Sequence, residues 1–270
     1  MISVLGGSGF IGSNLIREMN RRSIAYYAPK RDEHVGKRDL GHIIYCIGMT
    51  ADFRTKPFET VESHVCKLMN ILQNCQFESF TYLSSTRLYL KSISNNAKLT
   101  EEDDIVINPG EAFDLFSASK ITGELLALNS GRSNIKIVRV SNVFGRDIIS
   151  DNFITAIIRE AVKSNKIELF TTPDSSKDYI AVEDVCNALV LISELKTTGV
   201  FNLAFGSNTT NEVILNEINR LTGAEIKYSS HAKTVIFKEI DITKLTAQFG
   251  FKPAKRVIDS LPEIISAFKI

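Results

Sequence analysis

The chain has 270 residues, 44% of them hydrophobic, and a formal net charge of +1. This composition is typical of a globular protein with a full core, in one large domain or two unequal ones. A net charge so close to zero gives no electrostatic support for binding nucleic acid or a membrane surface, and neither partner is expected.

Four cysteines and four histidines are scattered along the chain. The cysteines form no CxxC pair and the histidines lack ligand-like spacing, so we expect reduced thiols and no metal site. No apolar run reaches the ~18 residues of a membrane helix, and the strand-like start leaves no room for a signal peptide. The sequence therefore favours a cytoplasmic protein.

Strand-like and helical patterns alternate over the first two thirds of the chain. In order, we expect a strand at 2–5, a helix at 11–21, strands at 24–27 and 42–47, a helix at 61–75, a strand at 80–83, a helix at 113–128 and a strand at 135–140. This alternation predicts a Rossmann-like, doubly wound parallel sheet of the α/β class. The basic and polar residues 30–41 are too few for a full crossover helix, so we expect a loop or a single helical turn there.

The remaining patterns are mixed. We expect helices at 153–163, 182–195, 212–221 and from 258, with strands at 167–170, 200–203, 226–228 and 235–237. These predict a small C-terminal substrate lobe. Residues 1–145 would form the dinucleotide-binding domain, to which 178–203 return, and residues 146–177 with 204–270 would form the lobe.

A glycine-rich turn follows the first strand-like run. In VLGGSGFIGSNL, Gly6 permits a tight turn, Gly9 lets the backbone approach a pyrophosphate, and Gly12 lets helix and strand pack closely. The helix that begins near Phe10 and Ile11 would offer backbone N–H groups to the phosphates. Strand, turn and helix stand in the order that a dinucleotide site requires.

The end of the second strand bears on the choice of cofactor. A carboxylate there holds the ribose 2′-hydroxyl of NAD, whereas a basic residue accommodates the 2′-phosphate of NADP. Here Lys30 and Arg31 come first and Asp32 only afterwards. This order favours NADP, with NAD as the alternative; the two basic residues could also belong to a solvated loop.

Several ordered motifs resemble the extended short-chain dehydrogenase/reductase superfamily, in its NAD-dependent epimerase/dehydratase branch, which acts on nucleotide sugars. GGSGFIG resembles GxxGxxG, FSASKITGE resembles YxxSKxxGE, RVSNVFG resembles LRxxNxxG, and KDYIAVEDV resembles RDFIxVxDV. FTYLSSTRLY, FNLAFG and DITKLTAQFGFKP also resemble landmarks of the branch. The resemblance covers essentially the whole chain.

The resemblance implies roles for particular residues. Ser85 would hydrogen-bond the sugar oxygen that is oxidised or reduced, Lys120 would bind the nicotinamide ribose, and Val140 would lie beside the nicotinamide. The positions expected to contact the substrate are Ser85, Thr86, Asn142 and Lys177. For Arg87 two interpretations stay open: it contacts a substrate phosphate, or it is a solvated charge in a loop. Asp178 and Asp184 are expected to cap a helix or to accept hydrogen bonds from the neighbouring backbone.

The catalytic tyrosine of the resemblance is replaced by Phe116, which lies one helical turn before Lys120. Phenylalanine keeps the ring but cannot pass a proton, and general acid–base catalysis is worth ~10²–10⁴-fold. Three interpretations stay open: an engineered variant of an active enzyme, a natural protein with another donor (Thr86, Tyr89 or water), or a catalytically silent dinucleotide-binding protein.

For the active form, NADP favours a keto-sugar reductase, and NAD would favour an epimerase or dehydratase that retains its cofactor. Thr86 and Arg87 follow Ser85, where dehydratases of this superfamily show Asp–Glu, which argues against that branch. The resemblance also implies a homodimer through the helices at 61–75 and 113–128.

Overall fold

The central element is a six-stranded parallel sheet in the order β2-β1-β3-β4-β5-β9. The computed structural model describes residues 1–31, 33, 35–50 and 52–268. The strands are β1 (Ile2–Leu5), β2 (Tyr26–Tyr27), β3 (His42–Tyr45), β4 (Ser79–Ser85), β5 (Ile135–Val140) and β9 (Gly199–Leu203). The chain places β2 on one side of β1 and then β3, β4 and β5 in turn on the other side. The strand order therefore reverses next to β1, and ligands of such sheets bind at this switch point.

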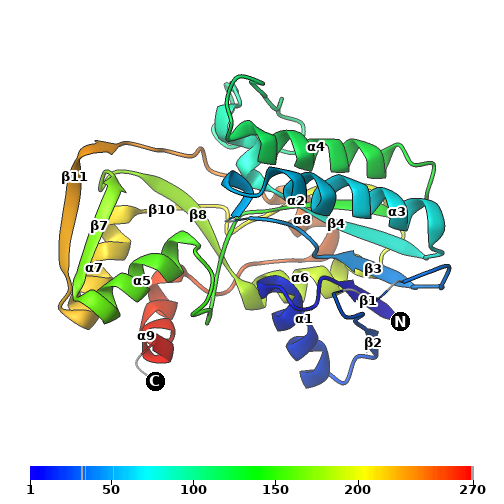
Figure 1. The fold of residues 1–270 in the computed structure, drawn as a ribbon, viewed down its shortest axis with the longest axis horizontal. Helices are drawn as coiled ribbons and strands as arrows, with labels where there is room; N and C mark the ends of the chain where they lie inside the picture. Colours follow the sequence, from blue (N-terminus) through cyan, green and yellow to red (C-terminus); the bar gives the residue numbers. More distant parts are fainter. Residues whose placement is uncertain (32, 34, 51, 269–270) are drawn as a thin grey trace.

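Helices cover both faces of this sheet, which confirms the predicted doubly wound fold (Figure 1). On one face lie α1 (Phe10–Arg21) and α6 (Val182–Ser193). On the other lie α4 (Asp114–Leu128) and a continuous helix made of α2 (Pro57–Val61), a π-helical turn η2 (Glu62–Cys66) and α3 (Lys67–Asn74).

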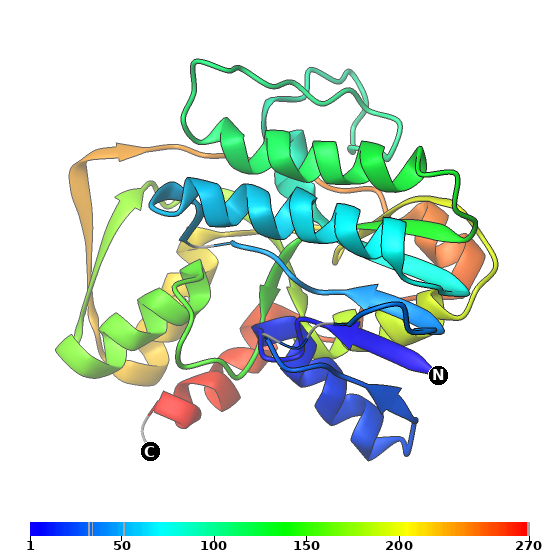
Figure 2. The same ribbon diagram turned by 45° about the vertical axis from the view of Figure 1, so that its right-hand side comes forward.

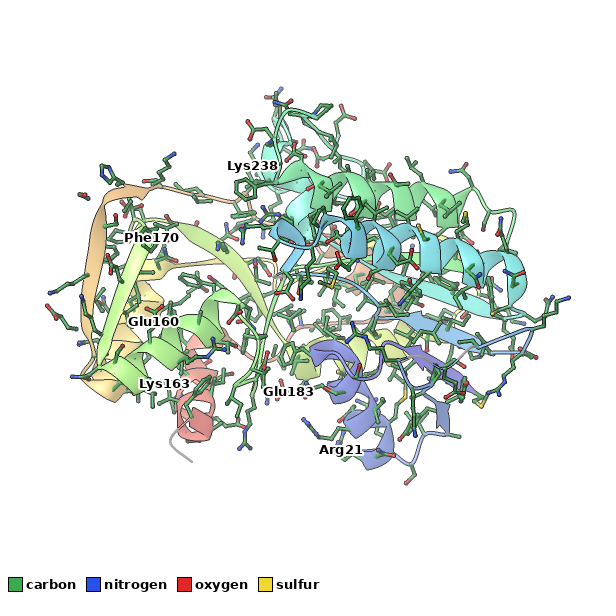
Figure 3. The ribbon with its side chains drawn as sticks, viewed as in Figure 1. Arg21, Glu160, Lys163, Phe170, Glu183 and Lys238 are labelled. Carbon is green, nitrogen blue, oxygen red and sulfur yellow. The ribbon has the colours of Figure 1, made fainter. Side chains whose placement is uncertain are left out.

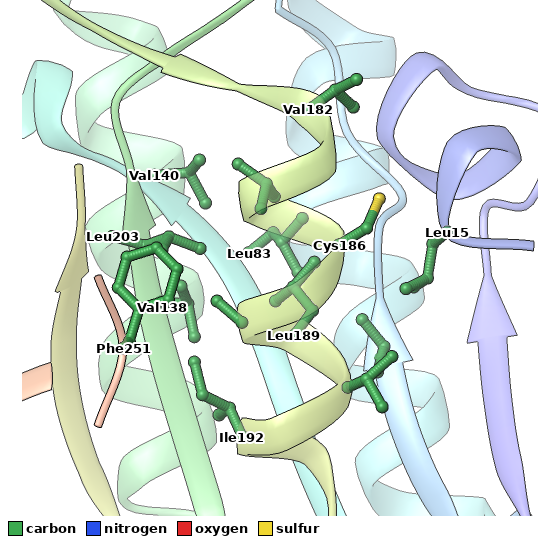
Figure 4. Close-up of a cluster of buried hydrophobic side chains, with 14 of the residues drawn as sticks. Leu15, Leu83, Val138, Val140, Val182, Cys186, Leu189, Ile192, Leu203 and Phe251 are labelled. Atoms are coloured by element: carbon green, nitrogen blue, oxygen red, sulfur yellow. The ribbon is translucent and has the colours of Figure 1, made fainter. Parts of the chain in front are cut away.

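The two faces divide the strand residues alternately, as the two-residue period of a strand requires. Val138 and Val140 pack against α6, where Leu189 and Ile192 are buried (Figure 4). Ile137, from the same strand, belongs instead to the cluster beneath α3 and α4. All six positions of β5 are buried, and four of them are apolar, as expected for a strand covered on both faces; the exceptions are Lys136 and Arg139.

The connection between β2 and β3 contains no helix among its described residues, as predicted. Asp39 forms an isolated parallel bridge with Gln76, so the segment runs along the sheet before β3 begins. β2 is only two residues long and is the edge of the sheet. The space beyond β1 is therefore framed by the loop 28–41.

The second part of the structure has its own apolar cluster, formed by α5, β7, α7 and α9 beside the large sheet (Figure 2). Its elements are β6 (Asn142–Phe144), α5 (Phe153–Ser164), β7 (Lys166–Thr171), β8 (Ser176–Ala181), β10 (Asn208–Thr210), α7 (Asn211–Thr222), β11 (Glu225–Lys233) and α9 (Val257–Phe268). The helix α8 (Thr243–Phe249) packs instead on the large sheet, beside β9. β8 pairs with β6 and β10, and β7 pairs with β11. Glu160 and Lys163 stand on the exposed side of α5 (Figure 3).

The strand expected at 235–237 is wrong. Only Ile236 forms an isolated bridge, with Ser176. The neighbouring N–H of Val235 donates to a side chain, Ser175 Oγ, at 3.0 Å, so a regular ladder does not continue.

Within the described residues, no helix is both long and apolar enough to cross a membrane.

Candidate active site

The glycine turn lies between the end of β1 and the start of α1, next to the end of β3. Gly6 has a φ of +93°, and a Cβ there would lie 2.8 Å from the backbone nitrogen of Ile47. A Cβ on Gly12 would lie 2.3 Å from the Gly6 carbonyl oxygen. Gly9 caps α1 without a side chain, which leaves the first N–H groups of the helix open to an anion.

A cavity of about 830 Å³ opens at this turn. The carboxyl ends of β1 and β3, the helix α3 and the loop after β2 line it. Gly6, Gly9, Lys30 and Arg31 all contribute to its wall, so the structure brings these four predicted residues together. Phe10, Ile11 and Gly12 open α1 directly behind the turn. The position at the switch point suits a dinucleotide.

The loop after β2 also brings a carboxylate to this cavity that the sequence reasoning missed. Glu33 accepts hydrogen bonds from the Tyr27 hydroxyl at 2.6 Å and the Lys30 backbone N–H at 3.2 Å, and these hold its pKa below the usual range. Among the described residues, no carboxylate lies within ion-pair distance of the Lys30 or Arg31 side chain. Asp32 lies outside the described residues.

Phe116 and Lys120 lie on the same face of α4, as their spacing predicts. The Phe116 ring is 3% exposed and packs against the rings of Phe53 and His64, with centroids 5.2 and 5.4 Å away. Lys120 Nζ donates to the Leu83 carbonyl oxygen at 2.7 Å. Burial lowers the pKa of Lys120 to about 7, so both its protonation states are accessible near neutral pH.

His64 is a second residue that the sequence reasoning missed. The Met49 backbone N–H donates to His64 Nε2 at 3.1 Å, so this nitrogen is unprotonated. Nδ1–H then donates to Ser119 Oγ at 2.8 Å, and Ser119 donates to the Phe116 carbonyl oxygen at 2.9 Å. Burial, with the nearby charge of Lys120, lowers the pKa of His64 to about 2.

His64 therefore stays neutral and orients α4 rather than donating a proton. It lies in the π-helical turn that interrupts the helix, a feature frequently found at functional sites. A sequence signal did exist, because His64 is four residues before the buried Leu68 and so faces inward.

The hydroxyl of Tyr89 does not face the site as a free donor. It donates to Asn202 Oδ1 at 2.8 Å and accepts from Arg139 at 2.7 Å, and Arg139 forms a buried ion pair with Glu124. At the end of β4, Ser85 Oγ accepts a hydrogen bond from the Arg87 backbone N–H at 3.2 Å. The hydroxyl hydrogen of Ser85 can therefore still donate to a ligand.

The other predicted substrate contacts, together with Val140, which is expected beside the nicotinamide, are spread over four elements. Thr86 is buried in the 3₁₀ helix η3 (Thr86–Lys91), directly after Ser85. Val140 ends β5 on the sheet, and Asn142 donates to the Asp178 carbonyl oxygen at 2.9 Å. Lys177 on β8 lies over the Phe153 ring at 4.9 Å.

The carboxylates of Asp178 and Asp184 accept hydrogen bonds from backbone N–H groups, as expected. Asp178 accepts the N–H groups of Phe205 and Gly206, at 2.9 and 2.7 Å. Asp184 accepts those of Ala254 and Lys255, at 2.9 and 3.1 Å. The Asp178 carboxylate also accepts a hydrogen bond from Ser141 Oγ at 2.6 Å, whereas both donors to Asp184 share one oxygen, Oδ2.

Residues 37–204 match the family model described as the NAD dependent epimerase/dehydratase family. UDP-glucuronic acid decarboxylase 1 of Arabidopsis thaliana is 21% identical over 99% of this chain and 69% of its own length. The dTDP-4-dehydro-6-deoxyglucose reductase of Escherichia coli is 21% identical over 99% of this chain and 97% of its own length.

Two solved structures share the fold. MoeE5 in complex with UDP-glucuronic acid and NAD is similar with a TM-score of 0.80 and 20% identity, over 99% of this chain and 98% of that one. RMD from Pseudomonas aeruginosa, complexed with NADPH, has a TM-score of 0.80 and 20% identity, over 99% of each chain.

Proposed function

Because the chain belongs to the NAD dependent epimerase/dehydratase family, we propose that it binds NADP and a nucleotide-linked sugar and acts as a keto-sugar reductase. The observation that carries this proposal is the 830 Å³ cavity at the glycine turn, which lies at the switch point of the sheet. The E. coli relative is named a reductase. An epimerase that retains NAD is the alternative within the same family.

The chain's own residues suit the binding and orienting parts of this reaction. The bound dinucleotide would supply a hydride at its nicotinamide. Gly6, Gly9 and the start of α1 would hold its pyrophosphate, and Lys120 would hold the ribose next to the nicotinamide. The Ser85 hydroxyl would donate to the sugar oxygen that accepts the charge.

NADP rather than NAD is proposed from the loop after β2. Lys30 and Arg31 line the cavity, while the carboxylate beside them, Glu33, is already occupied by Tyr27 and by the Lys30 backbone N–H. A 2′-phosphate would therefore meet two cations there.

The replacement of the tyrosine gives the decisive experiment. Phe116→Tyr restores a hydroxyl one helical turn from Lys120, and we expect it to raise kcat by ~10²–10⁴-fold. The measurement is NADPH oxidation with a panel of keto-sugar nucleotides; dinucleotide affinity serves as the control and should be unchanged.

A second function is favoured by one observation, the burial of Phe116, whose ring is 3% exposed and packs against the rings of Phe53 and His64. This packing suits a non-catalytic protein that holds or senses a dinucleotide. If the Phe116→Tyr protein binds NADPH yet oxidises none of it with any sugar, this second function replaces the first.

A homodimer through α3 and α4 also remains a proposal. Met69 and Leu125 on these helices are 42% and 55% exposed, which suits an apolar contact. Light scattering on the purified protein measures its mass directly.

We also propose that the protein is cytoplasmic.

A further inference from the structure

Two arginines lie beside Phe53, and a lysine from a distant part of the chain is close enough for its charge to interact with both. Arg54 and Arg87 place their guanidinium carbons 5.0 and 5.4 Å from the centre of the Phe53 ring. Lys177 reaches this region from β8, and its ammonium group contacts the Phe153 ring at 4.9 Å. We call Arg54, Arg87 and Lys177 the cationic cluster.

The cationic cluster lacks compensating charge. Among the described residues, none of its three members lies within ion-pair distance of a carboxylate. Asp114, whose charge does reach Arg87, is already bound to Lys91 at 2.7 Å and to the Asn108 N–H at 2.8 Å.

The three cations also repel one another. Burial and the charge of Arg54 lower the pKa of Arg87, and burial with the charges of Arg87 and Arg54 lowers the pKa of Lys177. Arg87 and Lys177 are partly buried and Arg54 is exposed. Cations that repel one another in this way are stabilised when an anion binds between them.

The cluster lies beside the catalytic position rather than in the dinucleotide cavity. The ring of Phe53, which carries both guanidinium groups, packs on the Phe116 ring at 5.2 Å. The backbone of Arg87 donates to Ser85 Oγ. None of the three cationic residues lines the 830 Å³ cavity. Through Phe53 and the Arg87 backbone, the cluster therefore adjoins Phe116 and Ser85, the positions proposed to act on the sugar.

We propose that the cationic cluster binds a carboxylate carried by the sugar itself, so that the substrate is a nucleotide-linked uronic acid. This inference rests on the proposed function. Two guanidinium groups on one ring suit a carboxylate, because each can form paired N–H···O bonds. The names of two similar proteins contain the same acid, UDP-glucuronic acid. A nucleotide diphosphate would be the other anionic group of such a substrate.

The test compares sugars that differ only at C6. Calorimetry on the NADPH-bound protein measures binding of UDP-glucuronic acid against UDP-glucose, and of GDP-mannuronic acid against GDP-mannose. We expect the acid of at least one pair to bind about tenfold more tightly. Arg87→Met keeps the stem that packs on Phe53 and should abolish this preference, leaving the neutral sugar within about twofold.

Two further variants guard against a folding defect. Arg54→Met, at an exposed position, should reduce the same preference, and Arg220→Met, on the surface of α7, should leave it intact. Equal binding of acid and neutral sugar, or equal loss of both in Arg87→Met, overturns the inference and assigns the cluster to the diphosphate. A protein that binds NADPH but none of the four sugars overturns this inference. The nucleotide-sugar function is overturned with it only if the Phe116→Tyr protein also oxidises no NADPH with any keto-sugar nucleotide.

Discussion

Lys120 holds its ammonium group in an apolar setting at the carboxyl end of β4. Its hydrogen bond to the Leu83 carbonyl oxygen fixes the side chain, and the Tyr82 ring lies 4.9 Å from Nζ. With no carboxylate bound to it among the described residues, burial sets its pKa at about 7. An anionic dinucleotide favours the charged form of such a group.

The affinity for NADPH should therefore depend on the protonation of Lys120. If the charged form binds, the dissociation constant rises by about tenfold between pH 6 and pH 8, since the charged fraction falls by that factor. Fluorescence titration across this range measures it. Lys120→Met should bind more weakly and lose most of the dependence; parallel curves for the two proteins would contradict the prediction.

Among the elements, those that sequence patterns predicted well are the buried strands and the amphipathic helices of the first two thirds. β6, β8 and β10 were missed because the two pairings among them, β6 with β8 and β8 with β10, join segments far apart in the chain, and short strands depend on such pairing. The π-helical turn was missed as well, because it is tied to contacts of His64 with Met49 and Ser119 that no local pattern encodes.

The segment between β2 and β3 is the element that should decide the cofactor. Arg31→Glu reverses one charge at the cavity wall, and we expect it to weaken NADPH binding by about tenfold or more while changing NADH binding less than threefold. Titration with both dinucleotides measures the ratio. Lys37→Glu, in the same segment but outside the cavity lining, is the matched control. If the unaltered protein binds NADH more tightly than NADPH, the proposal that NADP is the cofactor is wrong.

At the scale of the whole molecule, the chain order of motifs predicts that several site residues lie at one edge of the sheet; of these, Gly6 and Arg31 line the cavity, and the joint role of Ser85 and Lys120 with them stays a prediction. Gly6, Arg31, Ser85 and Lys120 each follow or face a parallel strand, and the carboxyl ends of such strands share one edge. The cationic cluster could not be predicted in this way. It depends on how β8 and η3 approach Phe53, and no spacing in the sequence reports that approach.

The stability of the whole molecule should depend on His64, because this side chain is buried and neutral. Its pKa of about 2 in the folded protein lies far below the unfolded value near 6.5. Such a group contributes stability that is present above pH 6.5 and is lost as the pH falls, since the unfolded chain then binds the extra proton.

We expect the free energy of unfolding to fall by about 2 kcal/mol between pH 7 and pH 5 on this account alone. Urea denaturation at the two pH values measures the change. His64→Asn removes the titrating ring and should flatten the dependence, although the variant itself is less stable because the bonds to Met49 and Ser119 are weakened. His231→Asn, at an exposed position of β11, should keep the slope of the unaltered protein. Equal slopes in all three proteins would show that His64 is not the group whose protonation destabilises the fold.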